Sequence, residues 1–257
     1  MSAPSTHPQS VGVEVRDLRK NFASLEVLKG VSFLVQPGEI FVIIGPSGSG
    51  KSVLLKHIIG LLTPDAGQIL IEGEPIQNPG VRDKYRMAMV FQSGALLTSL
   101  TVGENVGLYL TEHQLMPPPE IAAIVARVLE SVGLKGMENR SPGELSGGMQ
   151  KRVAIARALV VQPQLVLFDE PTSELDPPIA VTIAEEIVKL NRRTGATSIV
   201  VTHDRDLAFT IADRVAMIYE GRIILIGTPE EVRRSADPRV QKFIRAELST
   251  PKIAMTL

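Results

Sequence analysis

Residues 145–176 read LSGGMQKRVAIARALVVQPQLVLFDEPTSELD, and no other stretch of the chain says as much about its architecture. A Gly-rich turn opens a helix predicted over residues 150–160, and a short apolar strand follows it. The strand ends in two adjacent carboxylates, Asp169 and Glu170. A second Gly-rich segment, GPSGSGKS, lies upstream at residues 45–52. Together the two segments predict an α/β domain that binds a nucleotide.

The upstream segment matches the phosphate-loop pattern GxxxxGK[ST] at every fixed position. Its glycines let backbone N–H groups point inward around phosphate oxygens, and the helix predicted after the loop adds partial positive charge at its N-terminus. Lys51 is expected to reach the β- and γ-phosphates, and the Ser52 hydroxyl to ligate Mg²⁺. The predicted phosphate-binding residues are Gly45, Pro46, Ser47, Gly48, Ser49, Gly50, Lys51 and Ser52.

Four short apolar runs predict a buried parallel sheet. They cover residues 40–44, 87–91, 165–168 and 198–202. In chain order, the groups that follow these runs are Gly45, Gln92, the pair Asp169 and Glu170, and His203. Because ligands of open parallel sheets bind beyond the carboxyl ends of the strands, these groups are expected to share one site.

Each strand-end group has an expected role in nucleotide hydrolysis. We expect Asp169 to hold Mg²⁺, directly or through water, and Glu170 to act as the general base that polarises the attacking water. His203 is expected to contact the γ-phosphate and orient that water. Gln92 is expected to ligate Mg²⁺ and sense the γ-phosphate. A lone His or Gln after a strand is usually incidental, but four converging strands favour the catalytic interpretation.

Two further contacts with the nucleotide are predicted. Ser146, Gly147 and Gly148 form a second anion site at a helix N-terminus, for which a plain N-cap turn is the alternative. Since one domain carries two phosphate-binding turns, one of them is expected to serve a second molecule. Phe22 is a candidate for stacking on the base, without selecting ATP over GTP, and a place in the core is the alternative.

The rest of the chain surrounds this parallel core. The N-terminal part alternates with turns and predicts an antiparallel layer, with strands at 13–18, 26–28, 31–35 and 69–71. Residues 95–158 are predicted to be mostly helical and to form an inserted helical subdomain. The expected organisation is a disordered lead (1–10), a single domain (11–240), and a C-terminal helix and tail (241–257).

Composition excludes several classes of protein. The chain has 257 residues and a net charge of −1, which argues against nucleic acid as its partner. The absence of cysteine excludes disulfides, thiol catalysis and cysteine metal sites. No apolar run approaches the roughly 18–20 residues that span a bilayer. Any role at a membrane is therefore expected to depend on a partner.

These motifs resemble, over residues 11–235, the nucleotide-binding subunits of ATP-binding cassette (ABC) transporters. The resemblance implies an ABC-type P-loop NTPase core, with ATP and Mg²⁺ bound. Gln92 matches the Q-loop, Leu145–Met149 the signature, Ser173–Asp176 the D-loop and His203 the switch histidine, while Phe22 matches the aromatic position on adenine. In that family each ATP lies between one phosphate loop and the other subunit's signature. This chain carries a single set of motifs, so the resemblance implies a homodimer. It also implies that Asp176, the last residue of the D-loop, contributes to nucleotide binding.

Further residues resemble one branch of the family. Met149 stands where most members have Gln, and Glu174 where Ala or Gly is commoner. LSGGM, FQSGAL (91–96) and DPRVQKF (237–243) are similar to the ATPase of Mla-type, MCE-linked phospholipid transporters. This resemblance implies an integral membrane permease, an MCE-domain lipid-binding protein and a small accessory subunit as partners. It places the chain at the cytoplasmic face of the inner membrane, held there by the permease.

Three alternatives remain open on the sequence. The chain is compatible with an importer ATPase for another solute, such as an amino acid or a metal, because the catalytic core would be the same. A soluble single-cassette ABC ATPase acting in cofactor assembly is a second alternative. A nucleotide sensor without turnover is the third, and the intact Glu170 and His203 argue against it.

Overall fold

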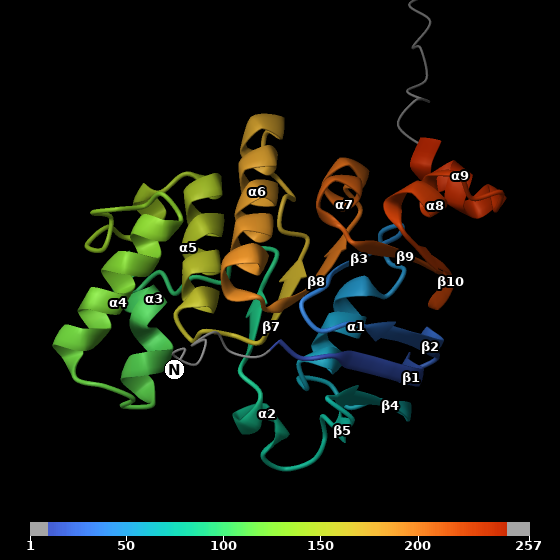
Figure 1. Cartoon of the computed structure of the whole chain (residues 1–257), viewed down its shortest axis with the longest axis horizontal. Coiled ribbons are helices and arrows are strands. Elements are labelled where there is room, and N and C mark those ends of the chain that lie inside the picture. The colour runs from blue at the N-terminus through green and yellow to red at the C-terminus, as the bar shows by residue number, and fades with distance from the viewer. Residues whose placement is uncertain (1–9, 246–257) are drawn as a thin grey trace, which may run out of the picture.

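The computed structural model describes residues 10–245, which form two β-sheets and a set of helices (Figure 1). The expected disordered lead lies outside the described residues except for Ser10, and so do residues 246–257 of the expected tail. The described chain is α/β, with a largely parallel sheet, an antiparallel sheet and inserted helices, which confirms the predicted fold class.

The larger sheet has six strands in the order β10-β9-β3-β8-β7-β6. Its strands are β3 (Ile40–Ile44), β6 (Met87–Val90), β7 (Leu165–Asp169), β8 (Thr197–Thr202), β9 (Arg214–Tyr219) and β10 (Arg222–Gly227). All neighbours are parallel except the β9–β10 hairpin at one edge. The run predicted at 87–91 thus ends one residue early, at Val90.

Side chains of the larger sheet alternate between two hydrophobic cores. In β3, Ile40, Val42 and Ile44 pack into the core built with the helices between residues 102 and 211, while Phe41 and Ile43 enter the core shared with the smaller sheet. All five are buried. Because both faces of the sheet are covered, its strands are continuous apolar runs, which is why the sequence predicts them so readily.

The smaller sheet is antiparallel, in the order β2-β1-β4-β5. Its strands are β1 (Val13–Phe22), β2 (Leu25–Val35), β4 (Ala66–Ile71) and β5 (Glu74–Pro75). The prediction of separate strands at 26–28 and 31–35 was wrong, because they form one strand, β2. Gly30 adopts a left-handed conformation (φ 85°), so the strand continues past an irregularity in its pairing with β1.

Helices fill the space around the sheets. Helix α1 (Lys51–Ile58) follows the phosphate loop and supplies Leu54, Leu55 and Ile58 to the core between the sheets. Between β6 and β7 the chain forms α3 (Val102–Glu112), α4 (Pro118–Ser131), a short 3₁₀ helix (Pro142–Glu144) and α5 (Gly147–Leu159). Figure 1 shows α3, α4 and α5 gathered at one end of the molecule, beyond α6.

Several helix ends have clear local causes. Helix α3 begins at a capping box, in which the Thr101 hydroxyl accepts from the Glu104 N–H and Glu104 accepts from the Thr101 N–H. Helix α5 begins at Gly147, three residues before the predicted start, because Ser146 caps it. The remaining helices are α2 (Val81–Lys84), α6 (Pro177–Thr194), α7 (Arg205–Ile211), α8 (Pro229–Arg233) and α9 (Pro238–Arg245).

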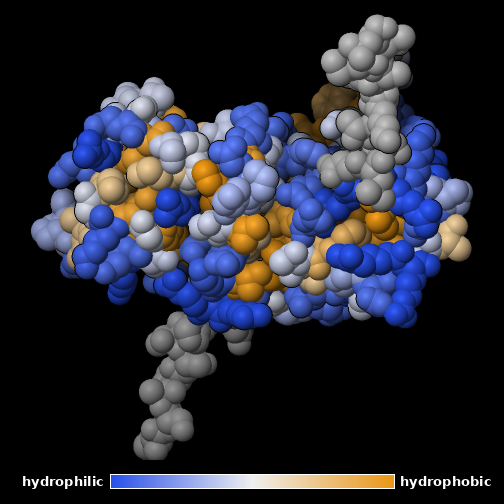
Figure 2. Space-filling model, turned by 90° about the horizontal axis from the view of Figure 1, so that it is seen from above, coloured by the Kyte–Doolittle hydropathy of each residue, from blue (hydrophilic) through white to orange (hydrophobic). Residues whose placement is uncertain are grey.

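Seen from above, hydrophilic side chains cover most of the face, and hydrophobic ones show between them (Figure 2). Of the helices between residues 10 and 245, none combines the length and apolar character that crossing a bilayer requires.

Candidate nucleotide site

The carboxyl ends of four parallel strands meet at one edge of the larger sheet. In register, Ile44 of β3 pairs with Thr202 of β8, Asp169 of β7 pairs with Val201 of β8, and Phe168 pairs with Val90 of β6. The residues that follow these strand ends therefore lie side by side. The structure brings together the phosphate loop, Gln92, Asp169, Glu170 and His203, as the sequence predicted.

The phosphate loop is a tight backbone cradle. Gly48 (φ 79°) and Gly50 (φ 102°) are left-handed, a conformation that side chains rarely allow. A Cβ on Gly45 would lie 2.2 Å from the carbonyl oxygen of Ile218, so only glycine fits there. Ser47 is exposed at the tip, while Ser49 is buried and its hydroxyl has no hydrogen-bond partner within the described residues. An unsatisfied buried hydroxyl is rare, and it fits a loop shaped to take a polar ligand.

The Lys51 side chain folds back against the phosphate loop. Its side chain is 6% exposed, and Nζ donates to the carbonyl oxygens of Gly45 (2.8 Å) and Pro46 (3.1 Å). Nζ also lies 3.5 Å from Oε1 of Glu170. Burial lowers the pKa of Lys51, and the nearby Glu170 and Asp169 oppose that shift. The ammonium is thus held where a phosphate would meet it, at the N-terminus of α1.

Ser52 and Asp169 supply oxygen atoms that suit a hard cation. The Ser52 hydroxyl donates to Oδ1 of Asp169 at 2.7 Å. Burial raises the pKa of Asp169, although the hydrogen bond from Ser52 partly offsets this. Within residues 10–245, no group of three or more His, Asp or Glu side chains is arranged so that it could hold a metal ion by itself. Two protein oxygens fit Mg²⁺, which keeps several waters and is completed by substrate phosphates.

Glu170 is held at the centre of the site. One of its carboxylate oxygens, Oε2, accepts from the His203 backbone N–H (3.1 Å) and lies 2.8 Å from His203 Nδ1. Its own N–H donates to the Val201 carbonyl (2.9 Å), and its backbone is left-handed (φ 47°). Strained conformations of this kind are concentrated at functional sites. The arrangement fixes a carboxylate beside the Lys51 ammonium and the His203 imidazole.

Gln92 and Phe22 differ in how they are placed. Gln92 is exposed after β6, and Lys151 donates to its backbone carbonyl. Phe22 lies at the end of β1 and is 44% exposed, which rules out the alternative that it is a core residue. The Lys20 ammonium lies 5.6 Å from the centre of its ring. Stacking of Phe22 on a base stays a prediction.

The signature residues lie apart from the phosphate loop. Ser146 caps α5 by accepting from the Met149 N–H at 3.3 Å, and both Ser146 and Gly147 are exposed. Gly148 is buried against α6, and Asp176 is exposed at the start of that helix. Within the described part of the chain, no hydrogen bond or ion pair joins these residues to residues 45–52. Within one copy, the signature turn and the phosphate loop are therefore not in direct polar contact among the described residues.

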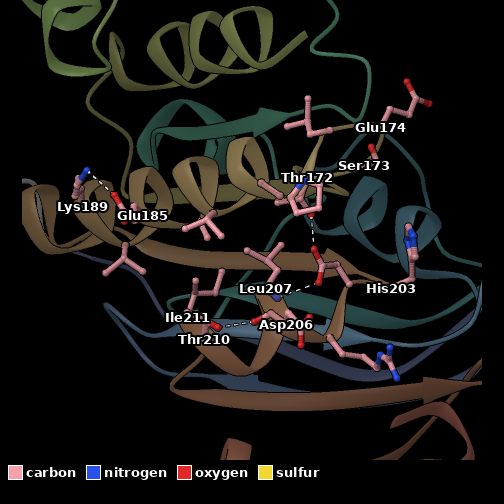
Figure 3. Close-up of a pocket in the computed structure, with 18 of the residues that line it drawn as sticks. Thr172, Ser173, Glu174, Glu185, Lys189, His203, Asp206, Leu207, Thr210 and Ile211 are labelled. Carbon is pink, nitrogen blue, oxygen red and sulfur yellow. Dashed lines mark hydrogen bonds and ion pairs between the residues drawn. The ribbon is translucent and has the colours of Figure 1, made fainter. Parts of the chain in front are cut away.

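Sequence reasoning missed two residues that support the site. Thr172 donates to Oδ2 of Asp204 at 3.0 Å, while Oδ1 of Asp204 accepts from the Leu207 N–H and so caps α7. Both residues line a cavity of about 770 Å³ between α6 and α7, with His203 at its edge (Figure 3). Asp204 directly follows the histidine and stands three residues before Leu207, which is an N-cap signal. That signal would have predicted the contact of Asp204 with the Leu207 N–H.

Residues 28–173 match the family model described as "ABC transporter". This span contains the phosphate loop, Gln92, the signature and both strand-end carboxylates. Phe22 and His203 lie outside it.

Several known proteins are similar over most of this chain. It is 42% identical to protein TRIGALACTOSYLDIACYLGLYCEROL 3, chloroplastic, of Arabidopsis thaliana, over 93% of this chain and 75% of that protein. It is 40% identical to the intermembrane phospholipid transport system ATP-binding protein MlaF of Haemophilus influenzae, over 93% of this chain and 92% of that protein. It is also 40% identical to the sulfate/thiosulfate import ATP-binding protein CysA of Synechococcus elongatus, over 92% of this chain and 68% of that protein.

A solved structure shares the fold. The dimeric structure of a post-hydrolysis state of the ATP-binding cassette MJ0796, bound to ADP and phosphate, superposes with a TM-score of 0.76. The two sequences are 32% identical, and the match covers 84% of this chain and 98% of that one.

Proposed function

This chain belongs to the ABC transporter family of ATP-hydrolysing proteins, and from that premise we propose that it powers phospholipid transport through a membrane permease. The observation that carries the proposal is the match to MlaF, which extends over nearly the whole of both sequences. The residues of the Mla-type resemblance, which include Met149 and the segment 91–96, support the same assignment.

Hydrolysis follows from the arrangement around Glu170. In the proposed mechanism, backbone N–H groups of residues 45–52 and the Lys51 ammonium bind the β- and γ-phosphates. Glu170 accepts a proton from the attacking water, and His203 orients that water and contacts the γ-phosphate. As phosphate binds, Lys51 exchanges its contacts with the Gly45 and Pro46 carbonyls and with Glu170 for phosphate oxygens, which leaves Glu170 free to act as the base.

Ser52, Asp169 and Gln92 are the proposed protein ligands of Mg²⁺, bound directly or through water. The cation supplies charge neutralisation for the β- and γ-phosphates when it is bound. Burial of Asp169 suits this task, because a desolvated carboxylate gains more from a nearby cation than an exposed one does.

A second copy of the chain is proposed to complete the site. Ser146 and Gly147 are exposed at the N-terminus of α5 and do not reach the phosphate loop of their own chain. A head-to-tail homodimer would place them on the γ-phosphate bound by the other copy, next to Asp176. The dimeric state of the MJ0796 cassette supports this arrangement.

The remaining partners follow from the proposed transport system. We infer an integral membrane permease, an MCE-domain lipid-binding protein and a small accessory subunit, with the chain held peripherally at the cytoplasmic face of the inner membrane. One chain of this kind, 40% identical, is named for sulfate and thiosulfate import. An importer of another solute is therefore the second candidate, with the same catalytic core.

The test is isolation of the tagged chain from detergent-solubilised native membranes, followed by mass spectrometry of proteins and lipids. The proposal expects a permease, an MCE-domain protein and bound phospholipid. A different permease without phospholipid would favour the other-solute importer. Soluble partners alone would contradict both transport functions and favour an assembly ATPase.

A further inference from the structure

Helix α5 carries two cations, the buried Lys151 and the partly buried Arg157, that face backbone carbonyl groups. Lys151 is 7% exposed, and its ammonium donates to the Gln92 carbonyl. Arg157 donates to the carbonyls of Gly94 and Ala95, both at 2.7 Å. Within residues 10–245, neither cation forms an ion pair with a carboxylate. Both cations therefore depend on the loop after β6 for their polar contacts.

The partial removal of these two cations from water has a cost that the loop must offset. Desolvation lowers the pKa of Lys151, and the negative charge of Glu174 is the strongest influence that opposes this shift. Desolvation also lowers the pKa of Arg157. Charge-assisted hydrogen bonds to carbonyl oxygens are the compensation. The loop is shaped to present them, since Gly94 (φ 73°) and Ala95 (φ 47°) are both left-handed.

The far end of the same loop is held by α3. The buried side chain of Asn105 accepts from the Leu97 N–H and donates to the carbonyls of Leu97, Leu100 and Thr101. Within the described chain, every hydrogen bond from residues 92–101 to another helix or strand thus goes to α3 or α5. The loop is fastened to the inserted helices and not to the sheet.

The start of α5 carries the signature turn. Ser146 caps this helix, so the signature turn and the residues that hold Gln92 belong to one rigid element. Lys151 lies little more than one helical turn from Ser146. Any displacement of the signature turn would therefore be passed to the backbone of Gln92.

We propose that Lys151 and Arg157 are positioning residues that couple the two ATP sites of the dimer through α5. This rests on the proposed function, in which Gln92 contacts its own chain's ATP and Ser146 contacts the ATP of the second copy. Engagement of Ser146 at one nucleotide sets the position of Gln92 at the other. Binding at the two sites is then positively cooperative.

Steady-state ATP hydrolysis by the purified full-length chain tests this, with rates measured against ATP at several protein concentrations. The wild type is expected to show a Hill coefficient above one. Lys151→Met and Arg157→Met should lower it toward one and raise the half-saturating ATP concentration by at least about fivefold, the usual lower bound for coupled sites. Lys151→Gln, which keeps a donor for the Gln92 carbonyl, should restore part of the cooperativity.

The control is Lys135→Met, which removes a lysine with a 77% exposed side chain from the loop after α4 and should leave the Hill coefficient at the wild-type value. Thermal unfolding confirms which variants are folded. A Hill coefficient of one in the wild type, or an unchanged coefficient in both folded methionine variants, overturns the coupling. Absence of ATP hydrolysis in the wild type would instead contradict the proposed function itself.

Discussion

Glu170 combines a left-handed backbone with contacts to two other catalytic candidates. Lys51 and His203 both reach its carboxylate, and Val201 fixes its backbone. The conformation costs on the order of 1–3 kcal/mol in a non-glycine residue. A non-glycine residue without an acidic side chain would bear the same cost without the two carboxylate contacts. The geometry thus points to the carboxylate as the reason for the strain.

Replacing Glu170 by Gln should keep ATP binding and remove the base. We expect the hydrolysis rate to fall by about 10²- to 10⁴-fold, the usual contribution of a general base. The measurement is phosphate release at saturating Mg-ATP, with nucleotide affinity determined in parallel. Glu220→Gln is the matched control, because Glu220 is also left-handed (φ 48°) but lies in the β9–β10 turn. Near-normal turnover in Glu170→Gln would remove it as the base.

Replacing Asp169 by Asn should increase the stability of the fold and abolish its activity. Its raised pKa means that the folded state binds its proton more tightly than the unfolded state, so stability falls as pH rises from the ordinary carboxyl range through that raised pKa. At neutral pH without Mg²⁺, Asp169→Asn should therefore raise both the free energy of unfolding and Tm. Mg²⁺-dependent hydrolysis should be lost.

Thermal unfolding of both proteins at pH 5 and pH 7.5, without divalent cations, measures this effect. The Tm difference should be larger at the higher pH, where Asp169 is charged. A variant that is less stable than the wild type at both values would show that the buried carboxylate stabilises the fold.

At the scale of elements, the approach of α5 to α6 depends on one glycine. A Cβ on Gly148 would lie 2.4 Å from Cγ2 of Ile179, closer than any packing allows. On the preceding Gly147, the nearest atom is Cδ2 of Leu175 at 3.6 Å, which is ordinary contact. The two glycines of the signature therefore differ: one is required by helix packing and the other is left exposed.

Gly148→Ala should destabilise the domain by about 1–3 kcal/mol through overpacking. Gly147→Ala, the matched control, should leave the free energy of unfolding within about 0.5 kcal/mol of the wild type. Urea unfolding followed by circular dichroism distinguishes them. Equal stability of the two variants would mean that α5 and α6 can move apart to admit the added methyl group without a loss of folding free energy.

At the scale of the whole molecule, the phosphate loop and the signature turn belong to different parts of the fold. Ser146 caps α5, one of the inserted helices, while the loop at 45–52 joins β3 of the larger sheet to α1. In the proposed homodimer, a complete ATP site therefore uses residues of two copies. The same separation underlies the proposed coupling through α5. The start of this helix belongs to one ATP site, and the loop that the helix holds after β6 belongs to the other.

Mg-ATP should convert Glu170→Gln from monomer to dimer, because bound nucleotide bridges the copies and is not hydrolysed. Light scattering should show the mass doubling only with nucleotide. Lys51→Ala in the same background should stay monomeric, since it loses the ammonium that binds the phosphates. A dimer of equal stability without ATP, or in the Lys51→Ala protein, would contradict the nucleotide-bridged arrangement.

The sequence by itself determined the parallel core, the phosphate loop and the convergence of Gln92, Asp169, Glu170 and His203. These are local patterns: a buried strand is an apolar run, and a phosphate loop needs glycines at fixed positions. It also determined the family, because the motifs are dense and ordered along the chain.

Only the tertiary structure decided that Phe22 is exposed, that 26–35 belong to one strand, and that Lys151 and Arg157 hold the loop after β6. Lys151 lies 59 residues from Gln92 along the chain, and Arg157 lies 63 residues from Gly94. No periodicity or spacing links such pairs. Their contact depends on where the inserted helices pack against the sheet, and that is set by the sum of many core contacts and not by any local sequence signal.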